Sequence, residues 1–305
     1  MRLTELGVAI KQVNRTQLNR QRLTPYLFLI PTFVPLTVGY FYPMLQAVYL
    51  SFYRTGLGRE LGPYVGLENY EQILSDPWFL NALSVSARYC FGSVIGVLII
   101  GLLTAMLLNQ SFRGRGLVRS LFLVPWAIPY VTAALIGRWI LDFNFGILNY
   151  VLDQLHLFSL SGNWLNDPSR AFFTVIVISI WKLFPLATVT YLAALQTIPQ
   201  ELYDAAMVDG ANAWQLLRHI TIPGVRSATT VLILLVGLWT FGRAFTFIFV
   251  LTGGGPVGAT ENVVLFTYLR AFQFFKPGLA SAAGTLVLII SGMVSLVYLV
   301  VSSRE

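Results

Sequence analysis

Six long apolar runs alternate with shorter polar segments along this chain. Each run has the length of about 20 residues that an α-helix needs to cross the hydrocarbon of a bilayer. A helix also satisfies its own backbone groups there. The pattern predicts an all-α integral membrane protein with six transmembrane helices. The runs are Tyr26–Leu50, Val85–Leu108, Leu121–Leu141, Phe172–Leu195, Thr229–Leu251 and Ala280–Val301.

Prolines fall inside the first, third and fourth runs: Pro31, Pro35, Pro43, Pro125, Pro129 and Pro185. A proline inside a helix frees a backbone carbonyl, which neighbouring helices can satisfy in a membrane. We therefore expect kinks at these positions rather than loops. The first run is too long for a cleaved signal peptide, and no small-residue cleavage pattern follows it.

The composition excludes an ordinary soluble domain. Of 305 residues, 56% are hydrophobic and 11% are charged, and the mean hydropathy is +0.70, whereas soluble domains carry about 25% charged residues. The net charge of +7 does not indicate nucleic-acid binding, because the basic residues are sparse and lie close to apolar runs. Cys90 is the single cysteine, so there is no disulfide framework, and its apolar surroundings indicate a small buried hydrophobe.

The distribution of Lys and Arg predicts the orientation in the bilayer. Eleven lie in the amino-terminal arm, after the second and fourth runs, and at the carboxyl end: Arg2, Lys11, Arg15, Arg20, Arg22, Arg113, Arg115, Arg119, Arg218, Arg226 and Arg304. Five lie in the other connecting segments: Arg54, Arg59, Arg170, Arg270 and Lys276. The positive-inside rule then places both termini in the cytoplasm.

Two regions follow from this orientation. Residues 1–24 form a basic cytoplasmic arm. This arm has few apolar residues at helical spacing, so two structures are open: a short helix on the membrane surface, or a solvated irregular segment. Residues 25–303 form the six-span domain, which includes a cytoplasmic loop at 197–223.

This polar loop, Thr197–Pro223, has helical character. Thr197 stands three residues before Gln200, the spacing of a capping box, and Gly210 suits a turn between two short helices. Apolar residues recur at helical spacing on both sides of the glycine: Leu202, Ala205, Ala206, Trp214, Leu217 and Ile220. Acidic residues lead the loop, whereas helices that rest on lipid favour Lys and Arg. We therefore predict a stiff helix–turn–helix that a water-side partner binds.

The loop contains Asp204-Ala205-Ala206, then Gly210, and then Ile220-x-Ile222-Pro223. This pattern resembles the EAA loop of ABC importer permeases, in the carbohydrate-uptake branch that includes maltose, glycerol-phosphate and trehalose types. Asp stands for the family's Glu, and Ile for its Leu before the proline. The resemblance implies a coupling helix that docks into a groove on a cytoplasmic ATPase subunit. The implied ATPase-coupling residues are Glu201, Asp204, Ala205, Ala206, Asp209, Gly210, Ile220 and Pro223.

The resemblance extends along nearly the whole chain. Further matching segments are Val65–Tyr70, Gly146–Asn149, Thr252–Pro256 and Gly278–Ala280. One departure is Phe245-Thr246, where many relatives carry Phe-Asp, so no role of that Asp transfers to this chain.

The resemblance implies a permease subunit that forms half of a pathway for a sugar or related polyol, in a bacterial or archaeal cytoplasmic membrane. Besides the lipid bilayer and the sugar, the implied partners are a cytoplasmic ATPase dimer, a second and related permease subunit, and an external solute-binding protein. The resemblance leaves open whether the permease pair is hetero- or homodimeric and which of its chains holds the sugar.

No phosphate loop of the form Gly-x-x-x-x-Gly-Lys-Ser/Thr is present, so ATP–Mg²⁺ is expected on the partner subunits. We expect no cofactor on this chain and no enzymatic activity of its own. Gly253–Gly258 lacks the lysine and is expected to form an outer turn. His156 and His219 fall on opposite sides of the membrane, which excludes a metal pair between them.

Four basic residues lie in or near the apolar runs, where a charge is costly and should face a polar cavity or a partner. Arg88 and Arg138 can snorkel to the outer interface. Lys182 and Arg243 lie near the middle of their runs. For these two, lining of a pathway, contact with a partner subunit and pairing with a backbone carbonyl all remain open.

Aromatic faces and hydrogen-bonding groups hold small polar ligands in pockets. With the two central cations, the candidate pathway residues are Trp181, Lys182, Tyr191, Trp239, Thr240, Arg243 and Thr246. A purely structural role is the alternative, because Trp and Tyr are common in any membrane protein.

Two other classes of protein fit the sequence less well. An ion-coupled secondary transporter of small solutes needs carboxylates in its spans, but all thirteen acidic residues lie in arms, loops or span ends, with Asp142 the nearest to lipid. A scaffold without transport would not explain two central cations together with a stiff docking loop.

Overall fold

The computed structural model describes residues 28–56, 61–158 and 161–302, without the side chains of Arg243 and of residues 297–302. The basic arm at 1–24 lies outside these residues. Helices dominate the described part, and its isolated β-bridge joins Tyr53 and Tyr64.

Four described helices are long and apolar enough to cross a membrane by themselves. They are Phe28–Leu50, which ends in α2 (Tyr42–Leu50), and α4 (Pro77–Asn109), α8 (Pro168–Leu195) and α14 (Pro277–Ser302). Two bent pairs pass the same test: α5 (Arg115–Ala127) with α6 (Tyr130–Ile140), bent by 98°, and Ala213–Gly224 with Arg226–Gly242 of α12 (Arg226–Leu251), bent by 66°. The described residues therefore hold four to six candidate spans, and the predicted six requires each bent pair to be one span.

The prolines of the third and fourth runs, where kinks were predicted, affect their helices in different ways. Pro185 lies inside α8 and Pro125 inside α5, and both helices continue through them. Pro129 is instead the N-cap of α6, at the 98° bend. The prediction of a kink is wrong here, because Ile128 and Pro129 both have extended ψ angles, 133° and 145°. A proline disfavours helical backbone in the residue before it, so the helix stops.

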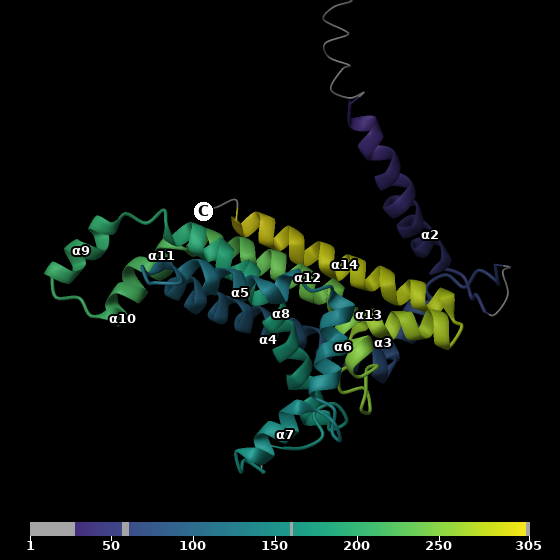
Figure 1. Cartoon of the computed structure of the whole chain (residues 1–305). Coiled ribbons are helices and arrows are strands. Elements are labelled where there is room, and N and C mark those ends of the chain that lie inside the picture. Colours follow the sequence, from purple (N-terminus) through teal and green to yellow (C-terminus); the bar gives the residue numbers. More distant parts are fainter. Residues whose placement is uncertain (1–27, 57–60, 159–160, 303–305) are drawn as a thin grey trace, which may run out of the picture.

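The long helices form a bundle from which α2 departs. Figure 1 shows α4, α5, α8, α12 and α14 running together, whereas α2, drawn in purple, leans away from them. α2 packs against α14, and no residue of the most apolar stretch of Phe28–Leu50 is buried within this chain. A helix that is apolar and uncovered by its own chain faces lipid or a partner.

The core of the bundle is a close contact between α4 and α8. A Cβ atom built on Gly92, Gly96 or Gly101 of α4 would lie within 3.1 Å of a side chain of α8. The facing residues are Ile176, Ile180 and Ala187. Small residues let membrane helices approach closely and gain van der Waals contact. This glycine seam therefore fixes the two helices against each other.

Shorter elements extend from the two ends of the bundle (Figure 1). At one end lie α3 (Glu68–Ser75), α13 (Val263–Tyr268) and η3 (Leu269–Gln273), and at the other lie α9 (Gln200–Val208), α10 (Ala213–Leu216), η2 (Leu217–Thr221) and α11 (Ile222–Gly224). A further short helix is α7 (Ile147–Gln154).

Candidate functional site

The loop between α8 and α12 is helical, as predicted, but its cap differs from the prediction. α9 begins at Gln200 with no side-chain cap, and Thr197 Oγ1 instead donates to the Ala194 carbonyl at 2.8 Å. The predicted Thr197 cap is therefore wrong. Two residues of the next helix form the capping box: Gln215 N donates to Asn212 Oδ1 at 3.0 Å, and Asn212 N donates to Gln215 Oε1 at 2.7 Å. The spacing Asn-x-x-Gln was a readable signal for it.

The predicted turn at Gly210 is confirmed. Gly210 has φ +82°, a left-handed backbone that glycine adopts without steric cost. Its N–H donates to the Met207 carbonyl at 3.1 Å, and the N–H of Ala211 donates to the Ala206 carbonyl at 2.9 Å. These two bonds are those of a Schellman motif, which ends a helix and satisfies its last carbonyls.

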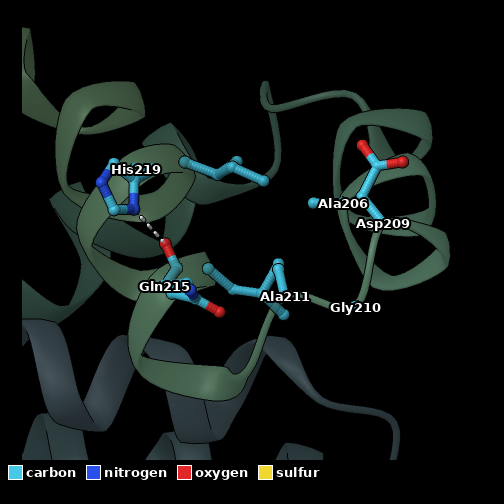
Figure 2. Close-up of a pocket in the computed structure, with 8 residues that line it drawn as sticks. Ala206, Asp209, Gly210, Ala211, Gln215 and His219 are labelled. Carbon is cyan, nitrogen blue, oxygen red and sulfur yellow. Dashed lines mark hydrogen bonds between the residues drawn. The ribbon is translucent and has the colours of Figure 1, made fainter.

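The two halves of the loop enclose a hollow. Tyr203 OH and Thr221 Oγ1 are 3.1 Å apart and fasten α9 to η2. The hollow has a volume of about 310 Å³ and is lined by Ala206, Asp209, Gly210, Ala211, Gln215, Leu216, His219 and Ile220. Figure 2 shows Asp209 on one side, with Gln215 and His219 on the other. His219 Nδ1 donates to the Gln215 carbonyl at 3.0 Å.

The sequence-predicted coupling residues lie on both sides of this turn. Ala206, Asp209, Gly210 and Ile220 line the hollow. The exposed residues of the set on α9 are Glu201, Asp204 and Ala205, and Pro223 is exposed in α11. Large apolar side chains share this surface: Leu202, Met207, Val208, Trp214 and Ile222. Exposed apolar groups next to acids on a stiff loop are typical of a protein-binding surface.

Lys182 lies at the break between α5 and α6. Its Nζ donates to the carbonyls of Pro125, Trp126 and Ile128 at 2.9, 2.7 and 2.6 Å. Nζ also lies 4.9 Å from the centroid of the Tyr130 ring, a cation–π contact. The side chain is 2% exposed. The structure thus shows the backbone pairing that was one of the possibilities for this cation.

The other candidate pathway residues divide between α8 and α12. Tyr191 and Trp239 join one apolar cluster, fully and partly buried respectively. Thr240 is buried, and its hydroxyl donates to the Val236 carbonyl at 2.8 Å. Trp181 is 37% exposed. Thr246 is half-buried, and the side chain of Arg243 lies outside the described atoms.

The two arginines that were expected to snorkel each contact a neighbouring helix of this chain. Arg88 lies with its guanidinium carbon 5.3 Å from the centroid of the Phe172 ring. Arg138 Nη1 donates to the Val250 carbonyl at 3.4 Å.

The end of the bundle that carries α3, α13 and η3 has an ion pair between segments that are distant in the sequence. Arg270 of η3 donates to Asp76 Oδ2 at 2.8 Å, and Asp76 also caps α4 through the N–H of Trp78 at 2.9 Å. Burial raises the pKa of the nearby Glu261 carboxyl; the Arg270 cation lowers it, and the Asp76 carboxylate raises it. Sequence reasoning missed this set, because 194 residues separate Arg270 from Asp76.

The Gly-rich segment at this end is a turn, as predicted. Thr252 and Thr260 share a hydrogen bond of 2.7 Å, and Asn81 of α4 donates to the Gly258 carbonyl at 3.0 Å. These bonds hold the turn against α4.

Comparison with known proteins defines the family. A family model described as a binding-protein-dependent transport system inner membrane component matches residues 97–304. The chain belongs to this family. It is similar to the trehalose/maltose transport system permease protein MalF of Thermococcus litoralis, with 33% identity over 92% of this chain and 94% of that protein. It is also similar to the sulfoquinovosyl glycerol transport system permease protein SmoG of Agrobacterium fabrum, with 32% identity over 91% and 90%.

Solved structures share the fold. A chain of a bacterial ABC transporter involved in the import of the acidic polysaccharide alginate superposes with a TM-score of 0.81, 22% identity, and coverage of 95% of this chain and 99% of that chain. A chain of a bacterial alginate ABC transporter in complex with an alginate pentasaccharide-bound periplasmic protein gives a TM-score of 0.80, with 22% identity. The chain is therefore a permease subunit of an ABC importer, as the EAA-like loop indicated, and the secondary-transporter alternative is set aside.

Proposed function

We propose that this chain forms half of a translocation pathway for a sugar or related polyol that an external solute-binding protein delivers. Its relatives are permeases for trehalose or maltose and for sulfoquinovosyl glycerol, which supports this class of solute. The proposed arrangement has six spans and both termini in the cytoplasm, with a basic arm at 1–24 and a membrane domain at 25–303. The location is the cytoplasmic membrane of a bacterium or archaeon.

The loop at 197–223 is the proposed contact with one subunit of a cytoplasmic ATPase dimer, which binds ATP–Mg²⁺. Its capping box, Schellman motif and Tyr203–Thr221 bond make it stiff. A stiff loop transmits displacement to α8, which enters it, and to α12, which leaves it. ATP-driven closure of the ATPases would then shift the spans between outward-open and inward-open states.

The observation that carries the proposal is this exposed, stiff, acidic and apolar loop on a chain of this family. The test is purification of the chain, through a tag on it, from the membranes of its own organism. An ATPase chain and a second, related permease are expected to co-purify, and a sugar-loaded external binding protein is expected to raise ATP hydrolysis. Recovery of the chain with neither partner would contradict the proposal.

The candidate pathway residues allow a second measurement on the same complex. Replacement of Trp181, Trp239 or Arg243 by Ala is expected to lower sugar uptake while the complex still assembles. Unchanged uptake in all three variants would remove these residues from the pathway.

A further inference from the structure

The break between α5 and α6 leaves backbone carbonyls without helical partners. In a continuous helix the Pro125 carbonyl would accept from the N–H of residue 129, but Pro129 has none. The carbonyls of Trp126 and Ile128 precede the start of α6 at Tyr130. Hydrocarbon offers no water to satisfy such groups, so another part of the protein must do so.

Lys182 supplies the missing donors from α8. An ammonium group has three N–H donors, and Nζ donates to the carbonyls of Pro125, Trp126 and Ile128. The cation also lies over the Tyr130 ring. All three donors are therefore used within the chain, and none is left for a solute. This separates Lys182 from a residue that lines a pathway.

The fold connects this lysine to the loop at 197–223. α8 carries Lys182 and leads into the loop. α12 leaves the loop and packs against α6. Arg138 of α6 also donates to the Val250 carbonyl of α12. The position of α6 thus depends on both spans that flank the loop, through Lys182 on one side and through packing on the other.

We infer that Lys182 is a positioning residue that holds the α5–α6 break at its angle and keeps α6 between the two spans that flank the loop. It acts on transport without touching the solute. The transport consequence rests on the proposed function, whereas the effect on the break does not.

The test measures the break directly in the purified complex. Spin labels are placed on cysteines introduced at Leu117 of α5 and Trp139 of α6, which are both 69% exposed, in a Cys90→Ser background. Lys182→Met, which has no donor, is expected to shift or broaden the distance distribution between the labels. Lys182→Gln, which has two donors and no charge, is expected to give a smaller change. Lys276→Met, on an exposed outer lysine, is the control and should leave the distribution unchanged.

Uptake assays give the second readout. Lys182→Met is expected to lower sugar transported per ATP hydrolysed about tenfold, within the range of typical coupling between sites, with little change in the KM for sugar.

A raised KM with an unchanged label distance would instead make Lys182 a solute contact and overturn the inference. So would wild-type distance and uptake in Lys182→Met. If Lys182→Met fails to accumulate, Lys182→Gln decides in the same way, and loss of both would reduce Lys182 to a folding residue and overturn the positioning role. A shifted distance in Lys182→Met, together with a wild-type complex that imports no sugar, would support the inference and contradict the proposed function.

Discussion

Glu261 lies in a setting where its charge is unfavourable. Burial raises the pKa of its carboxyl, and Arg270 only partly opposes this, because Asp76 is also near. An acid with a raised pKa in the folded state binds its proton more tightly there than in the unfolded chain. Its contribution to stability is therefore present at low pH and is lost as the pH rises from the ordinary Glu value through the raised one.

Glu261→Gln tests this direction of the pH dependence of stability. The variant is expected to flatten the fall in thermal midpoint between mildly acidic and neutral pH, and to be at least as stable as wild type at neutral pH. The measurement is the thermal midpoint of the purified complex across that range, with Glu71→Gln on the exposed face of α3 as control. A steeper pH dependence in Glu261→Gln would show that the Arg270 attraction outweighs burial.

Single residues also show which features can be predicted from the sequence and which cannot. Gly210 was predictable, because a turn between two helical patterns needs a left-handed residue and glycine supplies it. The predicted cap at Thr197 failed because α8 ends only at Leu195, with Gln196 at its cap, so the Thr197 hydroxyl reaches back to the Ala194 carbonyl. Pairs such as Asp76 with Arg270 depend on the packing of distant segments, which local patterns do not contain.

At the scale of elements, the hydrophobic pattern located the long helices but not their ends. The second run was expected to begin at Val85, whereas α4 begins at Pro77, where the Asp76 side chain caps its first turn. The glycine seam of α4 was not predicted, although Gly92 and Gly96 are four residues apart, a helical spacing. The break at Pro129 needed tertiary information, because Lys182 of another helix stabilises it.

The glycine seam makes a graded prediction. A Cβ on Gly101 would lie 2.5 Å from Ala187 Cβ and close to its backbone, which cannot move aside, whereas a Cβ on Gly96 meets the flexible end of Ile180. Gly101→Ala is expected to destabilise the chain by about 1–3 kcal/mol, typical of overpacking, and Gly96→Ala by less. Thermal midpoints check this, with Gly237→Ala as control because no atom lies within 4 Å of its Cβ. The reverse order would contradict rigid packing at Gly101.

The turn at Gly210 allows a matched pair of substitutions. Gly210 and Gly114 both have positive φ, +82° and +89°, and both face open space. Valine at either position forces a similar backbone strain, of about 1–2 kcal/mol. Gly210→Val is expected to lower uptake and sugar-stimulated ATP hydrolysis far more than Gly114→Val does, with both chains accumulating normally. Equal losses in the two variants would mean that strain alone, and not this loop, is responsible.

At the scale of the molecule, the asymmetry of Lys and Arg predicts which loops face the cytoplasm. Ser111 and Asn144 are exposed and lie before α5 and after α6. In a Cys90→Ser background, a membrane-impermeant thiol reagent is expected to label Asn144→Cys in intact cells and Ser111→Cys only after permeabilisation. Labelling in the opposite order would invert the proposed orientation, and equal labelling would show that the α5–α6 pair does not cross.

The carbonyls that Lys182 satisfies also constrain how the chain is made. Ribosomes synthesise from the amino end, and Lys182 follows Pro125 by 57 residues. The α5–α6 pair is therefore made first, with open carbonyls, and α8 follows with an ammonium near its middle. Either one alone is unfavourable in hydrocarbon, and each removes the other's penalty once they meet. We therefore expect α5–α6 and α8 to enter lipid together.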